Sequence, residues 1–195
     1  MNSLVDTHCH LDFPEFSNDL DAVLDRAIAA GIEKIISVGT SVSSSRKVVQ
    51  LASRYPNIFA TVGVHPNSVR DDETDFIKEL RDLAKHPKVV AIGETGLDFY
   101  RLPETDKSNV VETAFGSMTT ETIEIELKRD SLKAAQSAAF ELQLELAVEL
   151  QKPVVIHQRD SWDDTLSIIR QYPVQAVFHC FTGGRSEERR VGKEC

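Results

Sequence analysis

Six short runs of aliphatic and β-branched residues recur along the chain, and segments with helical periodicity separate them. Strands that alternate with helices pair in parallel, because each helix carries the chain back to the starting edge of the sheet. The pattern therefore predicts an α/β fold with a parallel sheet or a closed barrel. The expected strands cover residues 4–6, 34–38, 58–62, 89–92, 154–156 and 176–178.

The intervening segments place apolar residues three and four positions apart, as the buried face of a helix requires. The first segment ends at Gly31, and the second is expected to begin at a capping serine among residues 43–45 and to end before Pro56. This periodicity predicts five helices between the six strands. The residues expected on the buried faces are Leu20, Leu24, Ala27, Ile28, Val48, Val49, Leu51, Ala52, Phe76, Ile77, Leu80, Leu83, Ala84, Phe140, Leu144, Ala147, Val148, Trp162, Leu166 and Ile169.

The chain is long enough for one sizeable core, since 41% of its 195 residues are hydrophobic and 27% are charged. We therefore expect a single domain. The sequence does not open with a basic segment and a long apolar stretch, and it contains no run of about 18 apolar residues. A cytoplasmic protein without a membrane span is the expectation.

The formal net charge of −9 argues against a broad basic groove of the kind that holds duplex DNA. It does not exclude an anionic substrate, because two bound divalent cations would supply about four positive charges at one spot. An acidic protein with a recessed site suits a single strand or a frayed end better than an intact duplex.

The first expected strand leads into His8-Cys9-His10, in which two histidines stand two positions apart. Side chains on a strand alternate between its faces, so His8 and His10 point to the same side and could share one divalent cation. Imidazole is a common ligand for zinc and for other transition metals. For an isolated pair, two ordinary polar residues at the end of a strand are an equally good interpretation.

Further candidate ligands follow the other strands. His65 comes after the third strand, Glu94 after the fourth, His157 after the fifth and His179 after the sixth. Each residue alone has an ordinary explanation, such as a turn before proline or a core histidine bonded to a carbonyl. The carboxyl ends of barrel strands converge on one face, however, so these side chains are expected to meet. Together they predict a two-metal site, in which ions about 3.5–4 Å apart generate a hydroxide nucleophile and hold the attacking and leaving oxygens.

With these motifs the chain resembles the TatD family of metal-dependent nucleases, within the amidohydrolase-like TIM-barrel hydrolases. The resemblance runs from Val5 to Gly183 and includes five signatures in order, at residues 6–12, 62–66, 92–98, 155–157 and 179–183. It implies a TIM (β/α)8 barrel, of which the chain carries about six βα units.

The resemblance also implies roles for individual side chains. His65 and Arg159 would lie near the substrate phosphate. Magnesium, manganese and zinc all remain open as the native ion, because histidines suit zinc and manganese while phosphodiester chemistry often uses magnesium. Two divalent ions would share one bridging carboxylate and take two histidines each: His8 and His10 for the first ion, Glu94 as the bridge, and His157 and His179 for the second.

Several segments depart from the family pattern. Residues 102–133 form an unusually long polar stretch with a possible helix at 121–132. A lid and an ornamental surface excursion are both open interpretations of this stretch, and the absence of a ligand motif slightly favours the second. The family's remaining ligand, an aspartate after the eighth strand, has no counterpart in the chain. Residues 1–184 are thus expected to be a partial barrel, and residues 185–195 resemble the translation of a sequencing adapter more than a native helix. We expect the 195-residue chain itself to be inactive or nearly so.

The implied activity is that of a divalent-metal-dependent deoxyribonuclease that hydrolyses phosphodiesters near a DNA end. Two alternatives stay open. The first is a related barrel hydrolase that acts on an ester or amide, including aminoacyl-tRNA deacylation. The second is a non-catalytic scaffold that holds metal.

Overall fold

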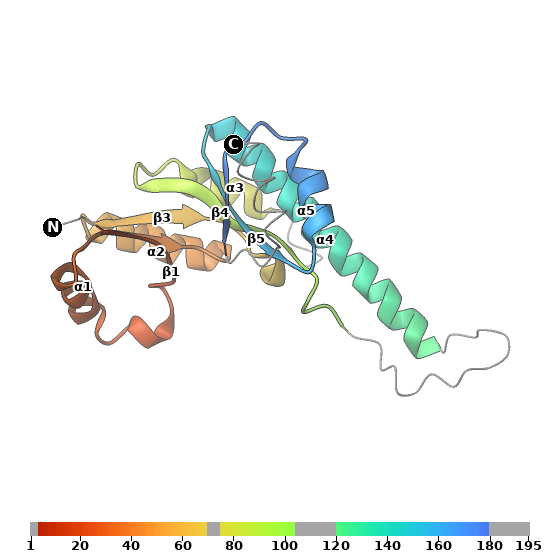
Figure 1. Ribbon diagram of the computed structural model, residues 1–195, viewed down its shortest axis with the longest axis horizontal. Coiled ribbons are helices and arrows are strands. Elements are labelled where there is room, and N and C mark those ends of the chain that lie inside the picture. The colour runs from red at the N-terminus through yellow and green to blue at the C-terminus, as the bar shows by residue number, and fades with distance from the viewer. Residues whose placement is uncertain (1–3, 70–74, 104–119, 180–195) are drawn as a thin grey trace.

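The computed structural model describes residues 4–69, 75–103 and 120–179, and a curled sheet lies at the centre of this part (Figure 1). The sheet has six parallel strands in the order of the chain. This arrangement confirms the predicted α/β class and all six expected strand positions; β3 has the predicted bounds, and the other five strands are longer than predicted. They are β1 (Leu4–Cys9), β2 (Ile32–Val38), β3 (Ile58–Val62), β4 (Val89–Asp98), β5 (Val154–Arg159) and β6 (Ala176–His179).

Five α-helices connect these strands in the described part of the chain, as the periodicity predicts. Past the end of α1, Gly31 has a φ of 90°, which glycine adopts without a steric penalty. The cap of α2 differs from the prediction, because Ser41 and not a serine at 43–45 accepts the hydrogen bond from the Ser44 N–H. The helices are α1 (Leu20–Ala29), α2 (Val42–Arg54), α3 (Phe76–Ala84), α4 (Thr120–Leu150) and α5 (Trp162–Ile169), with short 3-10 helices η1 (Pro14–Phe16) and η2 (Pro66–Ser68) after β1 and β3.

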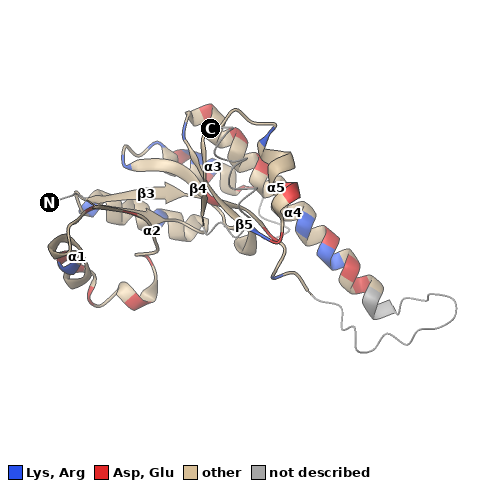
Figure 2. Cartoon of the chain, viewed as in Figure 1, with Lys and Arg blue, Asp and Glu red and all other residues tan. Residues whose placement is uncertain are grey.

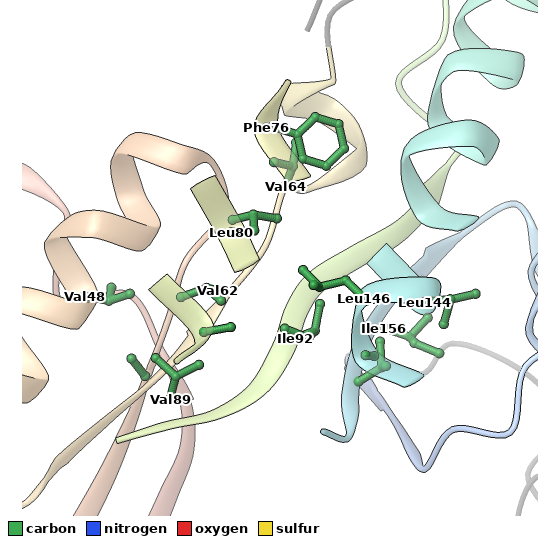
Figure 3. Packing of buried hydrophobic residues seen from close by; sticks show 14 of the residues in the cluster. Val48, Val62, Val64, Phe76, Leu80, Val89, Ile92, Leu144, Leu146 and Ile156 are labelled. Carbon is green, nitrogen blue, oxygen red and sulfur yellow. The ribbon is translucent and has the colours of Figure 1, made fainter. Parts of the chain in front are cut away.

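The core lies between the sheet and the helices that cover it (Figure 3). Leu80 of α3 and Leu144 of α4 are fully buried, as their helical spacing predicts. They belong to the same apolar cluster as Ile92 of β4 and Ile156 of β5. This cluster anchors the strands whose carboxyl ends carry the candidate ligands.

Two residues expected on buried faces are exposed instead. Ile28 of α1 is 56% exposed and Val148 of α4 is 37% exposed. Each lies at the margin of its helix's apolar stripe, so the packed face is narrower than the spacing alone indicates. In α4 the buried face turns toward Gln143 and Leu146, which periodicity did not single out.

Helix α4 is continuous over 31 residues, where the sequence predicts a short helix at 121–132 and a separate one before the fifth strand. At 1.5 Å per residue it is about 46 Å long. Its first turns reach beyond the sheet and carry charges of both signs (Figures 1 and 2). The end of the expected 102–133 insertion is therefore part of a core-packing helix, while its central part and the 185–195 segment lie outside the described residues.

Within the described residues the sheet is open at both edges, since β1 pairs only with β2 and β6 pairs only with β5. Leu4 on β1 is 53% exposed and Val177 on β6 is 63% exposed. These are the exposed apolar edges that a partial barrel predicts. None of the described helices combines the length and the apolar character that crossing a bilayer would require.

Candidate metal centre

The centre of the site is Glu94, a carboxylate that is only 3% exposed in the middle of β4. Its two oxygens face different histidines. Oε1 lies 2.9 Å from Nδ1 of His157 and 3.7 Å from Nε2 of His65. Oε2 lies 3.4 Å from Nε2 of His8. The carboxylate thus stands between histidines from the ends of three other strands.

These histidines, together with His179, form two groups that share Glu94. His8 and His179 belong to the first group, and His65 and His157 belong to the second. Within each group the potential ligand atoms lie within 4.8 Å of one another. The rings of His8 and His179 also stack with centroids 3.6 Å apart, so the curl of the sheet brings the ends of β1 and β6 together.

The groups divide the histidines differently from the division that the family resemblance implies. His10 belongs to neither group by distance, although its ring lies edge-on to His8 with centroids 5.1 Å apart. Its Nδ1 lies 3.0 Å from the carbonyl oxygen of Val38, to which it must donate. The Nε2 lone pair of a neutral His10 therefore remains available, as a metal ligand requires.

His65 shows the opposite hydrogen bonding. Its Nδ1 accepts a hydrogen bond of 3.1 Å from the backbone N–H of Asn67, in the turn that begins η2. In the neutral ring the proton must then sit on Nε2, the nitrogen that faces Glu94. His65 is close enough to be a ligand, but this tautomer makes it a hydrogen-bond donor into the centre.

Asp98 is part of the site, and the sequence reasoning gave it no role. It is 1% exposed at the end of β4, and its Oδ2 lies 3.2 Å from Nε2 of His157. The same oxygen accepts a hydrogen bond of 2.8 Å from the Asn67 side chain. The signal was present in the sequence, because residues four apart on a strand share a face and Asp98 stands four positions after Glu94.

The charges of the site favour a cation. Burial raises the pKa of Glu94, but the contacts with His157, His8 and His65 outweigh burial and bring the pKa well below its ordinary value. Burial likewise raises the pKa of Asp98, and hydrogen bonds from Asn67 and His157 outweigh it. Charged carboxylates therefore face the histidines at neutral pH.

The histidine pKa values shift in the direction that metal binding requires. Burial, reinforced by the neighbouring His157, lowers the pKa of His65 to about 4. Burial and the nearby His8 lower the pKa of His179. Neutral imidazoles next to ionised carboxylates are the protonation states in which these residues bind divalent cations.

The hydrogen bonding of two histidine rings shows whether the site fits a metal ion. The buried Nε2 of His8 has no hydrogen-bond partner in the described part of the chain. Both ring nitrogens of His157 face carboxylate oxygens, of Glu94 and of Asp98, but a neutral imidazole has only one N–H. A cation shared by His157 Nδ1 and Glu94 would remove this conflict, with Nε2–H donating to Asp98 as metal-bound histidines commonly do. The donor set therefore fits divalent ions.

Arg159 lies beside this centre. It follows His157 by two positions on β5, so the two side chains share a face of the strand. Its guanidinium carbon lies 3.6 Å from the centroid of the Tyr100 ring, and Tyr100 is 55% exposed. Among the described residues Arg159 forms no ion pair with a carboxylate, so its charge faces an aromatic ring and solvent.

The closeness of β4 and β5 at the centre depends on glycine. Gly96 has a φ of 136°, which side chains rarely adopt, and a Cβ there would collide with the carbonyl oxygen of His157. The glycines of the Gly93-Glu94-Thr95-Gly96 segment therefore let the strand that carries Glu94 approach the strand that carries His157.

The family model described as "TatD related DNase" matches residues 5–194. The match continues past Gly184, so it places no boundary at the start of the 185–195 segment. The "Uncharacterized metal-dependent hydrolase YabD" of Bacillus subtilis is 32% identical over 195 residues, which cover 98% of this chain and 64% of that protein.

Two further similar proteins carry TatD in their names. The "3'-5' ssDNA/RNA exonuclease TatD" of Klebsiella pneumoniae is 35% identical over 187 residues, covering 94% of this chain and 61% of the relative. The crystal structure of YJJV, a TatD homologue from Escherichia coli K12, superposes with a TM-score of 0.75 at 29% identity over 97% of this chain and 64% of that one. The chain thus spans 61–64% of the length of these relatives.

Proposed function

Because this chain belongs to the TatD-related DNase family of metal-dependent hydrolases, we propose that its protein is a two-metal nuclease that hydrolyses phosphodiesters at an end of single-stranded DNA. The observation that carries the proposal is the buried Glu94, whose two oxygens face separate groups of histidines. A relative that is 35% identical is named as an exonuclease of single-stranded DNA and RNA, which supports the substrate class.

We propose that five side chains hold the ions. The free Nε2 of His10 supports its place beside His8 on the first ion, and the Asp98 contact supports His157 as a ligand of the second. When bound, a pair of divalent cations supplies the positive charge that stabilises a transferring phosphoryl group and its flanking oxygens. The proposed ligands are His8 and His10 for one ion, His157 and His179 for the other, and Glu94 for both.

The remaining polar residues would bind and orient the substrate. The tautomer of His65 directs an Nε2–H into the centre, where it would donate to a phosphate oxygen. Arg159, held against Tyr100, would meet the phosphate with the two parallel N–H bonds that a guanidinium offers. Asp98 would keep the proton of His157 on Nε2, so that Nδ1 presents its lone pair.

An assay with matched substrates tests the proposal. The 195-residue chain and a form extended to the length of its relatives should be incubated with linear and circular single-stranded DNA, with magnesium, manganese or zinc. We expect the extended form to degrade only the linear strand and to stop when a chelator is added. Cleavage of an aminoacyl ester but not DNA would favour the deacylase alternative, and metal binding without turnover on either substrate would favour a scaffold.

Arg159 provides a second prediction. Replacing it with alanine is expected to raise the KM for single-stranded DNA about tenfold with a smaller change in kcat, since a charged hydrogen bond to a phosphate contributes about 1.5–3 kcal/mol. Arg159→Lys should recover only part of the loss, because lysine keeps the charge without the bidentate geometry. Steady-state kinetics on a short oligonucleotide measure both constants.

A matched control is Arg26→Ala, which removes the same charge from an exposed position on α1. Its KM should stay near that of the unsubstituted protein. An equal rise in KM for both variants would mean that net charge, and not a contact at Arg159, governs DNA binding.

A further inference from the structure

Strands β3 and β4 separate before they reach the metal centre. Their pairing ends at Val62 opposite Ile92, whereas β4 continues to Asp98 with only β5 beside it. Beyond the last pair, the backbone of Val64 and Asp98 is buried and faces no neighbouring strand on this side. Buried peptide groups need partners, so something must replace the missing pairing.

Two glutamines of α4 supply these partners. Gln143 accepts a hydrogen bond from the Val64 N–H at 2.8 Å and donates to the Val64 carbonyl oxygen at 3.1 Å. Gln136 accepts from the Asp98 N–H at 2.9 Å and donates to the Asp98 carbonyl oxygen at 3.2 Å. Each side-chain amide thus pairs with both polar groups of one residue, as an adjacent strand would.

The spacing of the two glutamines matches the spacing of the strand ends. Residues seven apart lie on one face of a helix, two turns from each other. Gln136 is 4% exposed and Gln143 is fully buried, so both amides lie in the interface between α4 and the sheet. The hydrogen bond from Asn67 of η2 to Asp98 then joins the segment after β3 to the end of β4.

We propose that Gln136 and Gln143 are positioning residues of the metal centre. Gln143 fixes the peptide that precedes His65, and Gln136 fixes the peptide of Asp98, whose carboxylate orients His157. Helix α4, which contributes no side chain to either group of candidate ligands, thereby sets the position of two rings in the centre. This role rests on the proposed function, because it presupposes that the centre binds metal and substrate.

Imidazole NMR of the metal-free chain tests the inference. Gln136→Met and Gln143→Met keep a side chain of similar length but remove both hydrogen bonds. Long-range ¹H–¹⁵N spectra should show a shift of the His157 ring signals in Gln136→Met and of the His65 signals in Gln143→Met. The amides of Asp98 and Val64, respectively, should exchange with solvent about tenfold faster, because each loses a buried hydrogen bond.

Phe140→Leu is the matched control, since Phe140 lies between the glutamines on the same helix face and is fully buried. It should lower the thermal midpoint and leave both ring signals in place. Ring signals that stay unchanged in the glutamine variants, or that move equally in Phe140→Leu, would overturn the inference. Because no metal or substrate enters this experiment, such a result leaves the proposed nuclease activity standing, and an inactive enzyme would not alter the ring shifts.

Discussion

Glu94→Gln is expected to remove both metal ions, whereas His179→Ala is expected to remove only one. Glutamine has nearly the same shape as glutamate but lacks the charge, and it offers only one oxygen to the two groups of histidines. We expect affinity for both ions to fall by more than the 10–100-fold that loss of an outer-shell partner typically costs. Elemental analysis of the purified variants, after equilibration with manganese or zinc, measures the ions that remain.

The comparison with His179→Ala separates a bridging carboxylate from an ordinary ligand. In the proposed ligand set His179 contributes to one ion only, so its loss should leave the other ion bound. In an extended, active form, Glu94→Gln should also reduce kcat by at least about 10²-fold, the loss that follows removal of a principal transition-state stabiliser. Retention of two ions by Glu94→Gln would contradict the bridge.

Gly96→Ala is expected to destabilise the protein more than the same change at any other glycine of the described residues, because a Cβ at Gly96 would make the shortest contact. An alanine at this position would be held at a φ that side chains rarely adopt, which costs about 1–3 kcal/mol of stability. Its Cβ would also collide with the His157 carbonyl oxygen, and this overpacking costs about 1–3 kcal/mol more. A total near 4 kcal/mol corresponds to a fall in melting temperature of roughly 8–16 °C for a chain of this size. Chemical and thermal denaturation followed by circular dichroism measure both quantities.

Gly31→Ala measures how much of the loss of stability comes from backbone strain alone. Gly31 also has a positive φ, but a Cβ there would meet nothing within 4 Å. Its loss of stability should therefore be about 1–2 kcal/mol, from conformational strain alone. Equal losses in the two variants would show that contact with β5 contributes nothing at Gly96.

Sequence periodicity predicted the strands because each needs only local information. The run at 58–62 is Ile-Phe-Ala-Thr-Val, which is rich in the β-branched and aromatic residues that favour strands, and β3 has the predicted bounds. The motifs at the strand ends also placed Glu94 and its neighbouring histidines at one face of the sheet, since parallel strands share a direction. The shared carboxylate is visible in the structure where the family resemblance expected a bridge.

What the sequence could not supply is the direction of each ring. Spacing puts His8 and His10 on one face, but only the hydrogen bond to Val38, from a different strand, shows which nitrogen of His10 is free. The tautomer of His65 depends in the same way on the turn at Asn67. Periodicity also split α4 in two, because its polar outer turns lack the apolar stripe that marks the inner ones.

The order of the strands has a consequence for how the protein is made. Each strand pairs with the one synthesised just before it, so the sheet can extend while the chain leaves the ribosome. The stacked rings of His8 and His179, in contrast, join the first strand to the sixth and close the longest loop among the described strands. We therefore expect a nascent chain to gain its sheet gradually and the contact between His8 and His179 abruptly, when β6 arrives.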